Sequence, residues 1–183
     1  MGRENQSFSD KSRLDTSALD RPKRKQLPRN KFLFIQIKDK KITRILSELK
    51  SELSPKKSSS TNIHITVNGP KKIFRNKDLE ERIKKYKKEH PYITIGGVGR
   101  FFNSDVYVIY MKADCGDLRE YNLWEKPDYK NSYNPHITIY EGRDQKMADN
   151  AYERIKSLDK KYKCADYEFL VHTVAQSDLN PWF

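Results

Sequence analysis

Apolar residues recur along the chain with two spacings, which predict alternating strands and helices. Compact apolar runs such as FLFIQI at 32–37 and VYVIYM at 106–111 are typical of strands. On this basis we predict strands at 32–37, 62–67, 92–102, 106–111, 136–140 and 167–175. Apolar residues spaced by three or four predict helices at 42–53, 79–86, 117–125 (a short one) and 148–158.

The order strand, helix, strand, helix, strand occurs twice along the chain. The offset between corresponding elements is steady along the chain. It is 73 residues from Phe32 to Asp105 at the first strands and 74 residues from Tyr92 to Asp166 at the last. A repeat of this length predicts a pseudo-symmetric α+β protein of two related lobes, with halves at about 31–103 and 104–176 within one domain over 31–183.

Residues 1–30 differ from the rest in having no useful apolar periodicity. The stretch DRPKRKQLPR at 20–29 is dominated by Lys and Arg and is interrupted by two prolines. Such a segment buries too little apolar surface to offset the entropy of ordering it, so we predict a flexible basic arm. Its charge could tether a polyanion, or it could serve only as a solubilising tail, and the sequence leaves both open.

The net charge of the chain indicates which kind of partner it binds. The 183 residues carry 37 Lys and Arg against 25 Asp and Glu, a net charge of +12, which favours anionic partners such as nucleic acid or nucleotides. No apolar run approaches the roughly 20 residues of a membrane span, and the first residues lack the apolar stretch of a secretory signal. Cys115 and Cys164 have no metal-type spacing. We therefore expect a soluble, cytoplasmic protein with no membrane partner.

Two strands carry the same short motif, His-apolar-Thr-apolar. It reads His64-Ile-Thr66-Val in the first half and His136-Ile-Thr138-Ile in the second, with the two histidines 72 residues apart. Because side chains alternate across a strand, each histidine shares a face with its threonine while the isoleucines face the core. If the strands are related by a pseudo-two-fold axis, the two imidazoles face each other across a cleft.

This arrangement suits phosphodiester chemistry. A neutral imidazole can take a proton from the nucleophile while an imidazolium protonates the leaving oxygen. The hydroxyls of Thr66 and Thr138 can donate to the non-bridging oxygens, where charge develops. The alternative without catalysis is a pair of half-buried histidines on a solvated sheet face. A zinc site would need further ligands, and neither motif has a carboxylate or thiol at ligand spacing. We expect no metal and no cofactor.

The paired motifs within a duplicated α+β chain resemble the two-histidine phosphoesterase superfamily, the LigT-like group. The resemblance covers about residues 31–176. It implies two lobes, each an antiparallel-rich sheet with helices on its outer face, around a central cleft. It also implies that His64 and His136 are the catalytic imidazoles and that Thr66 and Thr138 hold the phosphate.

Further residues near the motif strands are candidates for substrate binding, each with a structural alternative. Asn68 and Tyr140 share the histidine face if the period of two continues. Lys71, with Lys72 beside it, and Arg143 lie just past the motif strands and could pair with phosphate, although solvated surface charge is the simpler explanation for each of them. Tyr133 precedes the second motif and could stack on a base. Arg100, Phe101 and Phe102 could line the cleft or belong to the core.

These observations predict a metal-independent phosphodiesterase acting on a nucleotide or oligonucleotide derived from RNA. A terminal 2',3'-cyclic phosphate of RNA is the first expected substrate, and a cyclic or 2',5'-linked signalling oligonucleotide is the second. The alternative of another class is a non-catalytic, basic RNA-binding module. The presence of both motifs weighs against that alternative, since a pure binder has no need of two imidazole–hydroxyl pairs.

Overall fold

The computed structural model describes residues 31–53, 62–71, 76–103, 105–124 and 133–173 of the chain. The strands are β1 (Lys31–Ile37), β2 (His64–Lys71), β3 (Ile93–Asn103), β4 (Val106–Asp114), β5 (His136–Gly142), β6 (Lys161–Cys164) and β7 (Tyr167–Thr173). The helices are α1 (Lys40–Leu53), α2 (Asn76–Glu89) and α3 (Gln145–Lys156). The predicted arm at 1–30 lies outside the described residues.

The strands form two antiparallel sheets with matching strand order. One sheet has the order β2-β1-β7 and the other the order β5-β4-β3-β6. If β1, β2 and β7 correspond to β4, β5 and β3, the two orders are the same and β6 is an added edge strand. The expected two-lobed α+β fold is confirmed, and the repeated element order reflects this shared arrangement.

The sheets do not follow the two halves of the sequence. β3 belongs to the first half but pairs with β4 and β6, whereas β7 belongs to the second half and pairs with β1. The boundary expected at residues 103 and 104 therefore falls between β3 and β4, which pair in one sheet. Each sheet thus contains one strand from the other half of the sequence, so the chain crosses between the two sheets at these strands.

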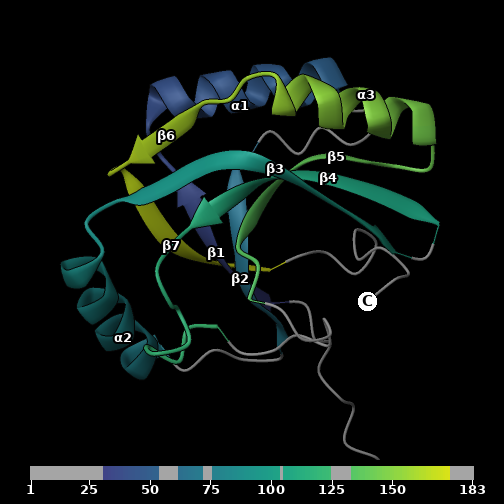
Figure 1. Ribbon diagram of the computed structural model, residues 1–183. Coiled ribbons are helices and arrows are strands. Elements are labelled where there is room, and N and C mark those ends of the chain that lie inside the picture. The colour runs from purple at the N-terminus through teal and green to yellow at the C-terminus, as the bar shows by residue number, and fades with distance from the viewer. Residues whose placement is uncertain (1–30, 54–61, 72–75, 104, 125–132, 174–183) are drawn as a thin grey trace, which may run out of the picture.

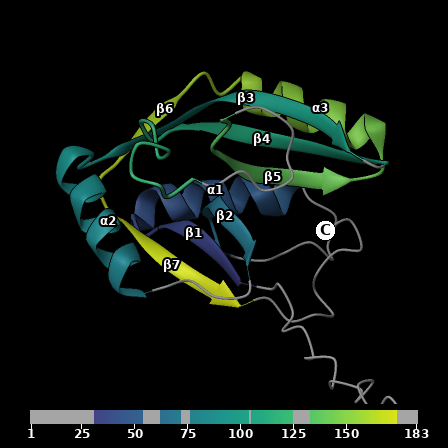
Figure 2. The same cartoon turned by 90° about the horizontal axis from the view of Figure 1, so that it is seen from below.

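Helices α1 and α3 lie side by side above the sheets in Figure 1. Seen from below in Figure 2, both sheets lie in front of these two helices. An aspartate begins each helix: the side chain of Asp39 accepts from the backbone N–H of Ile42 at 2.9 Å, and that of Asp144 accepts from Met147 at 3.0 Å. Helices α1 and α3 thus cover one side of the sheets.

One apolar core fills the space between the sheets and the helices. It includes Ile63 just before β2, Ile65 within β2, and Ile137 and Ile139 of β5, all at most 2% exposed. This burial fixes the register of both strands, because a slip of one residue would turn these isoleucines to solvent. The alternation predicted for the motif strands is therefore correct at the histidines and threonines.

Helix α2 packs at the end of the sheets through an aromatic cluster. Tyr86 is fully buried and meets Phe169 of β7 and Tyr121 edge-on, at ring separations of 5.4 and 5.3 Å. Its hydroxyl donates to the carbonyl of Cys115 at 2.7 Å. The helix begins at Asn76, and Asp78 stands in its first turn.

Two local expectations differ from the structure. The short helix predicted over 117–125 is wrong: turns occupy 118–122. Gly116 adopts a positive φ of 60°, and the side chain of Asp117 accepts from the backbone N–H of Arg119, so the chain turns rather than winding a helix. Strand β6 was not predicted, because its four residues are half lysine and gain their order by pairing with β3.

No helix in the described part of the chain is long and apolar enough to cross a membrane.

Candidate active site

The two motif strands are the edge strands of their sheets, and β2 and β5 lie next to each other where the sheets meet. This places the motif side chains around one small cavity. Its lining consists of Lys50, Asn62, His64, Thr66, His136, Ile137 and Thr138. The structure therefore brings together the four residues for which the sequence predicted chemistry.

The two imidazoles are held in the same way. Nδ1 of His64 lies 3.0 Å from the carbonyl oxygen of Asn62, and Nδ1 of His136 lies 2.7 Å from that of Asn134. A carbonyl oxygen can only accept, so each Nδ1 carries the proton and each Nε2 is free to exchange one with a substrate. Each histidine is oriented by the backbone two residues before it.

An aromatic ring from the neighbouring strand supports each imidazole. Phe34 of β1 lies 4.2 Å from His64, and Tyr110 of β4 lies 4.5 Å from His136, both measured between ring centroids. The cross-strand register is also shared, since Thr66 faces Phe34 and Thr138 faces Tyr110. The pseudo-symmetry thus extends from the strand order to the environment of each histidine.

Burial lowers the pKa of both histidines. For His64 burial is the largest cause, the hydrogen bond to Asn62 opposes it, and the charges of Lys50, His172 and His136 lower the pKa further. For His136 burial also dominates, opposed by the hydrogen bond to Asn134. Burial therefore favours the neutral form of both imidazoles before a substrate binds, and an anionic phosphate would raise both pKa values.

Lys50 is a site residue that the sequence analysis missed. It stands in the last turn of α1, is half-buried and lines the cavity with both motifs. Burial lowers its pKa, and the nearby charge of Glu141 opposes that shift. One signal was present in the sequence: Lys50 follows the buried Leu46 by four residues, which puts a charge on the apolar face of an amphipathic helix.

The prediction that Asn68 and Tyr140 face the cleft is wrong. Each motif strand has a bulge just after its threonine: Thr66 and Asn68 face the adjacent residues Phe34 and Leu33. In β5, Thr138 and Tyr140 likewise face the adjacent Tyr110 and Ile109. A bulge inserts one residue and breaks the alternation, so the side chains beyond it turn into the core.

Both residues have structural partners there. Asn68 is 4% exposed, and its Nδ2 donates to the carbonyl of Leu123 at 3.1 Å. Tyr140 is fully buried, and its hydroxyl donates to the carbonyl of Asp144 at 3.0 Å. Each side chain therefore ties a motif strand to a neighbouring segment, the turns before residue 124 in one case and the start of α3 in the other.

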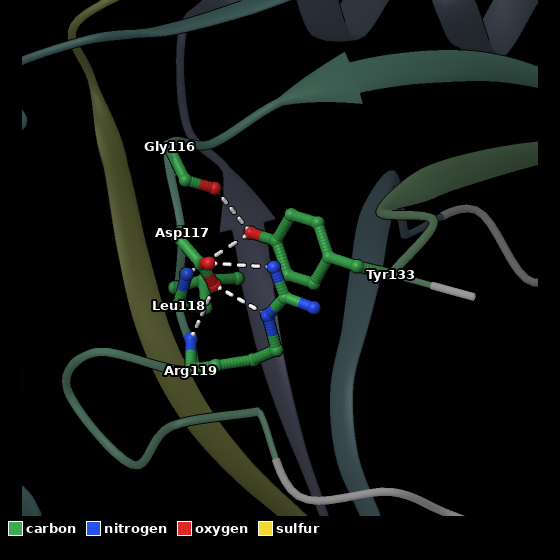
Figure 3. A network of polar contacts seen from close by, with 5 residues as sticks. All are labelled: Gly116, Asp117, Leu118, Arg119 and Tyr133. Atoms are coloured by element: carbon green, nitrogen blue, oxygen red, sulfur yellow. Dashed lines mark hydrogen bonds and ion pairs between the residues drawn. The ribbon is translucent and has the colours of Figure 1, made fainter. Parts of the chain in front are cut away.

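Tyr133 also has a structural role. Figure 3 shows its hydroxyl against the turn at Gly116 and Leu118: it donates to the Gly116 carbonyl and accepts from the Leu118 N–H, the latter at 3.1 Å. The guanidinium of Arg119 lies 4.9 Å from the centre of its ring and is paired with Asp117. The ring and the hydroxyl of Tyr133, which were expected to bind a base, are thus both in contact with this turn. Tyr133 therefore stabilises the turn.

The remaining candidates divide between the cleft and the surface. Lys71 is the last residue of β2 and Arg143 follows β5, and neither lines the cavity; Lys72 lies outside the described residues. Arg100 points toward α3, where it pairs with Asp149 at 3.2 Å. Phe101 is 36% exposed and meets His136 edge-on at 5.8 Å, so it belongs to the rim of the site. Phe102 is exposed beside Tyr107.

Within the described ranges, no group of three or more His, Cys, Asp or Glu is arranged to hold a metal ion. Two pseudo-symmetric sheets whose adjoining edge strands each present a histidine and a threonine define the two-lobed fold of the two-histidine phosphoesterases. The family model of the 2'-5' RNA ligase superfamily matches residues 37–177, and the chain belongs to that superfamily. No curated protein and no solved structure matched the chain.

Proposed function

We propose that this protein is a metal-independent phosphodiesterase that cleaves a nucleotide or oligonucleotide phosphodiester. The observation that carries the proposal is the pair of imidazoles at one cavity, each anchored through Nδ1 with Nε2 available. Two such groups can act as general base and general acid in a single displacement at phosphorus. Membership of the superfamily supports the same chemistry.

The threonines complete the site. Thr66 and Thr138 line the cavity beside the histidines, so their hydroxyls can donate to the two non-bridging oxygens of a phosphodiester. A hydroxyl rotates freely and carries one donor, which suits an oxygen whose charge grows as the bond to the leaving group breaks. Burial of the imidazoles strengthens these interactions, because the local dielectric is lower than in water.

A terminal 2',3'-cyclic phosphate of RNA is the first substrate we propose. The oxygen of the attacking water forms a bond to phosphorus while one imidazole takes its proton. The ring P–O bond breaks, and the other imidazole protonates the released hydroxyl oxygen. The product is a phosphomonoester with one free neighbouring hydroxyl. The cyclic ester is small, so the phosphate can enter the cavity while the base lies on the rim.

A second candidate substrate is a cyclic or 2',5'-linked oligonucleotide, and the aromatic rings favour it. Phe34 stands beside His64, and the exposed Phe101 stands beside His136. Aromatic rings on both sides of a phosphate suit a linkage with a base at each end, since stacking contributes about 1–3 kcal/mol per base. A terminal cyclic phosphate has only one base next to the reacting phosphorus.

Turnover of a substrate panel in the presence of EDTA tests the proposal. The panel contains 2',3'-cyclic mononucleotides, an RNA ending in a cyclic phosphate, and 2',5'- and 3',5'-linked dinucleotides. We expect turnover of at least one member that chelation leaves unchanged. Binding of the RNA without turnover of any member would instead support the non-catalytic RNA-binding module, and loss in EDTA with rescue by zinc or manganese would exclude the metal-independent mechanism.

A further inference from the structure

Lys50 breaks the pseudo-symmetry of the site. The strands, bulges, threonines and supporting rings correspond in pairs, but the lysine at the cavity comes from α1, the connection between β1 and β2. The corresponding connection between β4 and β5 has turns at 118–122 and no helix within its described part. A cation from α1 therefore lines the cavity without an equivalent among the other lining residues.

The charge of Lys50 acts on His64 in particular. Three positive or titratable groups face His64 from different elements: Lys50 of α1, His172 of β7 and His136 of β5. Glu168 lies on the same sheet face two strands away, but it is paired with Lys38 at 2.9 Å. Lys50 precedes both histidines among the charged causes that lower the pKa of His64.

His136 has a different charge environment. Lys112 stands opposite it on β4, but the lysine side chain extends along β3, with its Cδ 3.9 Å from the position of a Cβ at residue 97. Among the described residues, burial lowers the pKa of His136 and the hydrogen bond to Asn134 opposes it, with no contribution from Lys50. Glu141 acts on Lys50 rather than on either imidazole.

We propose that Lys50 holds a non-bridging oxygen of the scissile phosphate and makes His64 the general base and His136 the general acid. The inference rests on the proposed phosphodiesterase function and adds to it a third phosphate-holding group and a direction of proton transfer. A cation near His64 favours the neutral imidazole, which can accept a proton. His136 lacks that neighbour and is the imidazole that a bound phosphate anion protonates more readily.

In the proposed step, Nε2 of His64 takes a proton from the attacking hydroxyl or water, whose oxygen forms a bond to phosphorus. The bond from phosphorus to the leaving oxygen breaks, and the proton on Nε2 of His136 passes to that oxygen. His64 ends protonated and His136 ends neutral, so a proton returns through solvent before the next turnover. Lys50 and the threonines neutralise the non-bridging oxygens throughout.

Substituting Lys50 tests the first part. Lys50→Met should lower kcat/KM by about 10- to 100-fold, as expected for losing one charged group at the transition state. It should also move the acidic limb of the pH profile of kcat/KM to higher pH, because His64 loses a neighbouring positive charge. Lys50→Arg should keep most of the activity, and the acidic limb of its pH profile should lie at the same pH as in the wild type. Lys41→Met, at an exposed position of the same helix, is the matched control and should change neither.

Two measurements separate this inference from the proposed function. NMR titration needs no turnover: Lys50→Met should raise the pKa of His64 and leave that of His136 unchanged, and no shift at His64 would overturn the inference. With a nucleotide p-nitrophenyl ester, whose leaving group needs no protonation, His136→Ala should recover most of the wild-type rate while His64→Ala should not. The reverse pattern would overturn the assignment of base and acid even if the protein is a phosphodiesterase.

Discussion

The phenol ring of Tyr110 lies against the imidazole of His136, 4.5 Å between ring centroids, and it occupies the space where a side chain at residue 99 would stand. Gly99 faces Tyr110 across the β3–β4 pair, and a Cβ there would overlap the phenol ring. A glycine in one strand thus leaves room for the ring that supports a catalytic candidate on a third strand.

Gly99→Ala should therefore displace Tyr110 toward His136. We expect a loss of about 1–3 kcal/mol in the free energy of unfolding, the usual cost of overpacking, and a fall in kcat larger than in Tyr110→Phe. Urea denaturation and steady-state kinetics measure the two effects. The double variant Gly99→Ala/Tyr110→Leu should regain stability, because the smaller side chain removes the overlap. A Gly99→Ala variant with the full wild-type stability would contradict the close packing of the Tyr110 ring on Gly99.

Replacing either motif histidine with alanine should abolish most of the activity. We expect His64→Ala and His136→Ala each to lower kcat by roughly 100-fold or more, the range for losing a general acid or base. Both side chains lie on the cleft face, so circular dichroism should show an unchanged fold. His172→Ala is the matched control: it is exposed on β7 near His64 and should stay within a few-fold of wild type. Comparable losses in all three variants would point to a structural cause.

The lowered pKa values of the two histidines predict a pH dependence of stability. Below 6.5, the ordinary pKa of histidine, the unfolded chain binds protons that the folded chain does not. Stability therefore falls as pH drops from about 7 toward the folded pKa values. Chemical denaturation at pH 7 and pH 5.5 measures this loss, which should be smaller in the double variant His64→Gln/His136→Gln. An equal loss in wild type and the double variant would contradict the lowered pKa values.

Asn68 and Tyr140 should affect stability rather than turnover. Asn68→Ala leaves the buried carbonyl of Leu123 without its partner, at a cost of about 1–3 kcal/mol. Tyr140→Phe removes the hydrogen bond to Asp144 and should cost about 1 kcal/mol. Thermal unfolding tests both, and kcat/KM measured well below the midpoint should remain close to wild type. A rise in KM for a nucleotide substrate without a loss of stability would contradict the structural role and indicate that these residues bind substrate.

Deleting residues 1–30 should weaken binding to long RNA and leave the chemistry intact. The segment holds eight Lys and Arg against four Asp and Glu. Fewer counterions should be released on binding, so the salt dependence of affinity should become flatter. A small cyclic nucleotide has too little backbone to reach such an arm, and its kcat/KM should hardly change. A large loss with the small substrate would place the segment at the cleft.

Much of the site could be predicted from the sequence because the orientation of each motif side chain depends on its own strand. Two strands with His-apolar-Thr-apolar put each histidine and threonine on one face through backbone geometry alone, and the burial of Ile65 and Ile137 shows that the alternation holds. The repeat offset likewise indicated two related sheets. The same local rule gave the wrong orientation for Asn68 and Tyr140, because a bulge depends on the partner strand and not on the strand's own residues.

The sequence by itself determined the two motifs, their pairing in a repeat, and the α+β class, since these follow from residue type and from periodicities of two and 3.6. Only the tertiary structure decided that β3 and β7 exchange sheets, that the bulges bury Asn68 and Tyr140, and that Lys50 reaches the cavity from a helix. Each of these depends on which segments, far apart in the sequence, pack together, and burial and charge at a site are set by those neighbours rather than by adjacent residues.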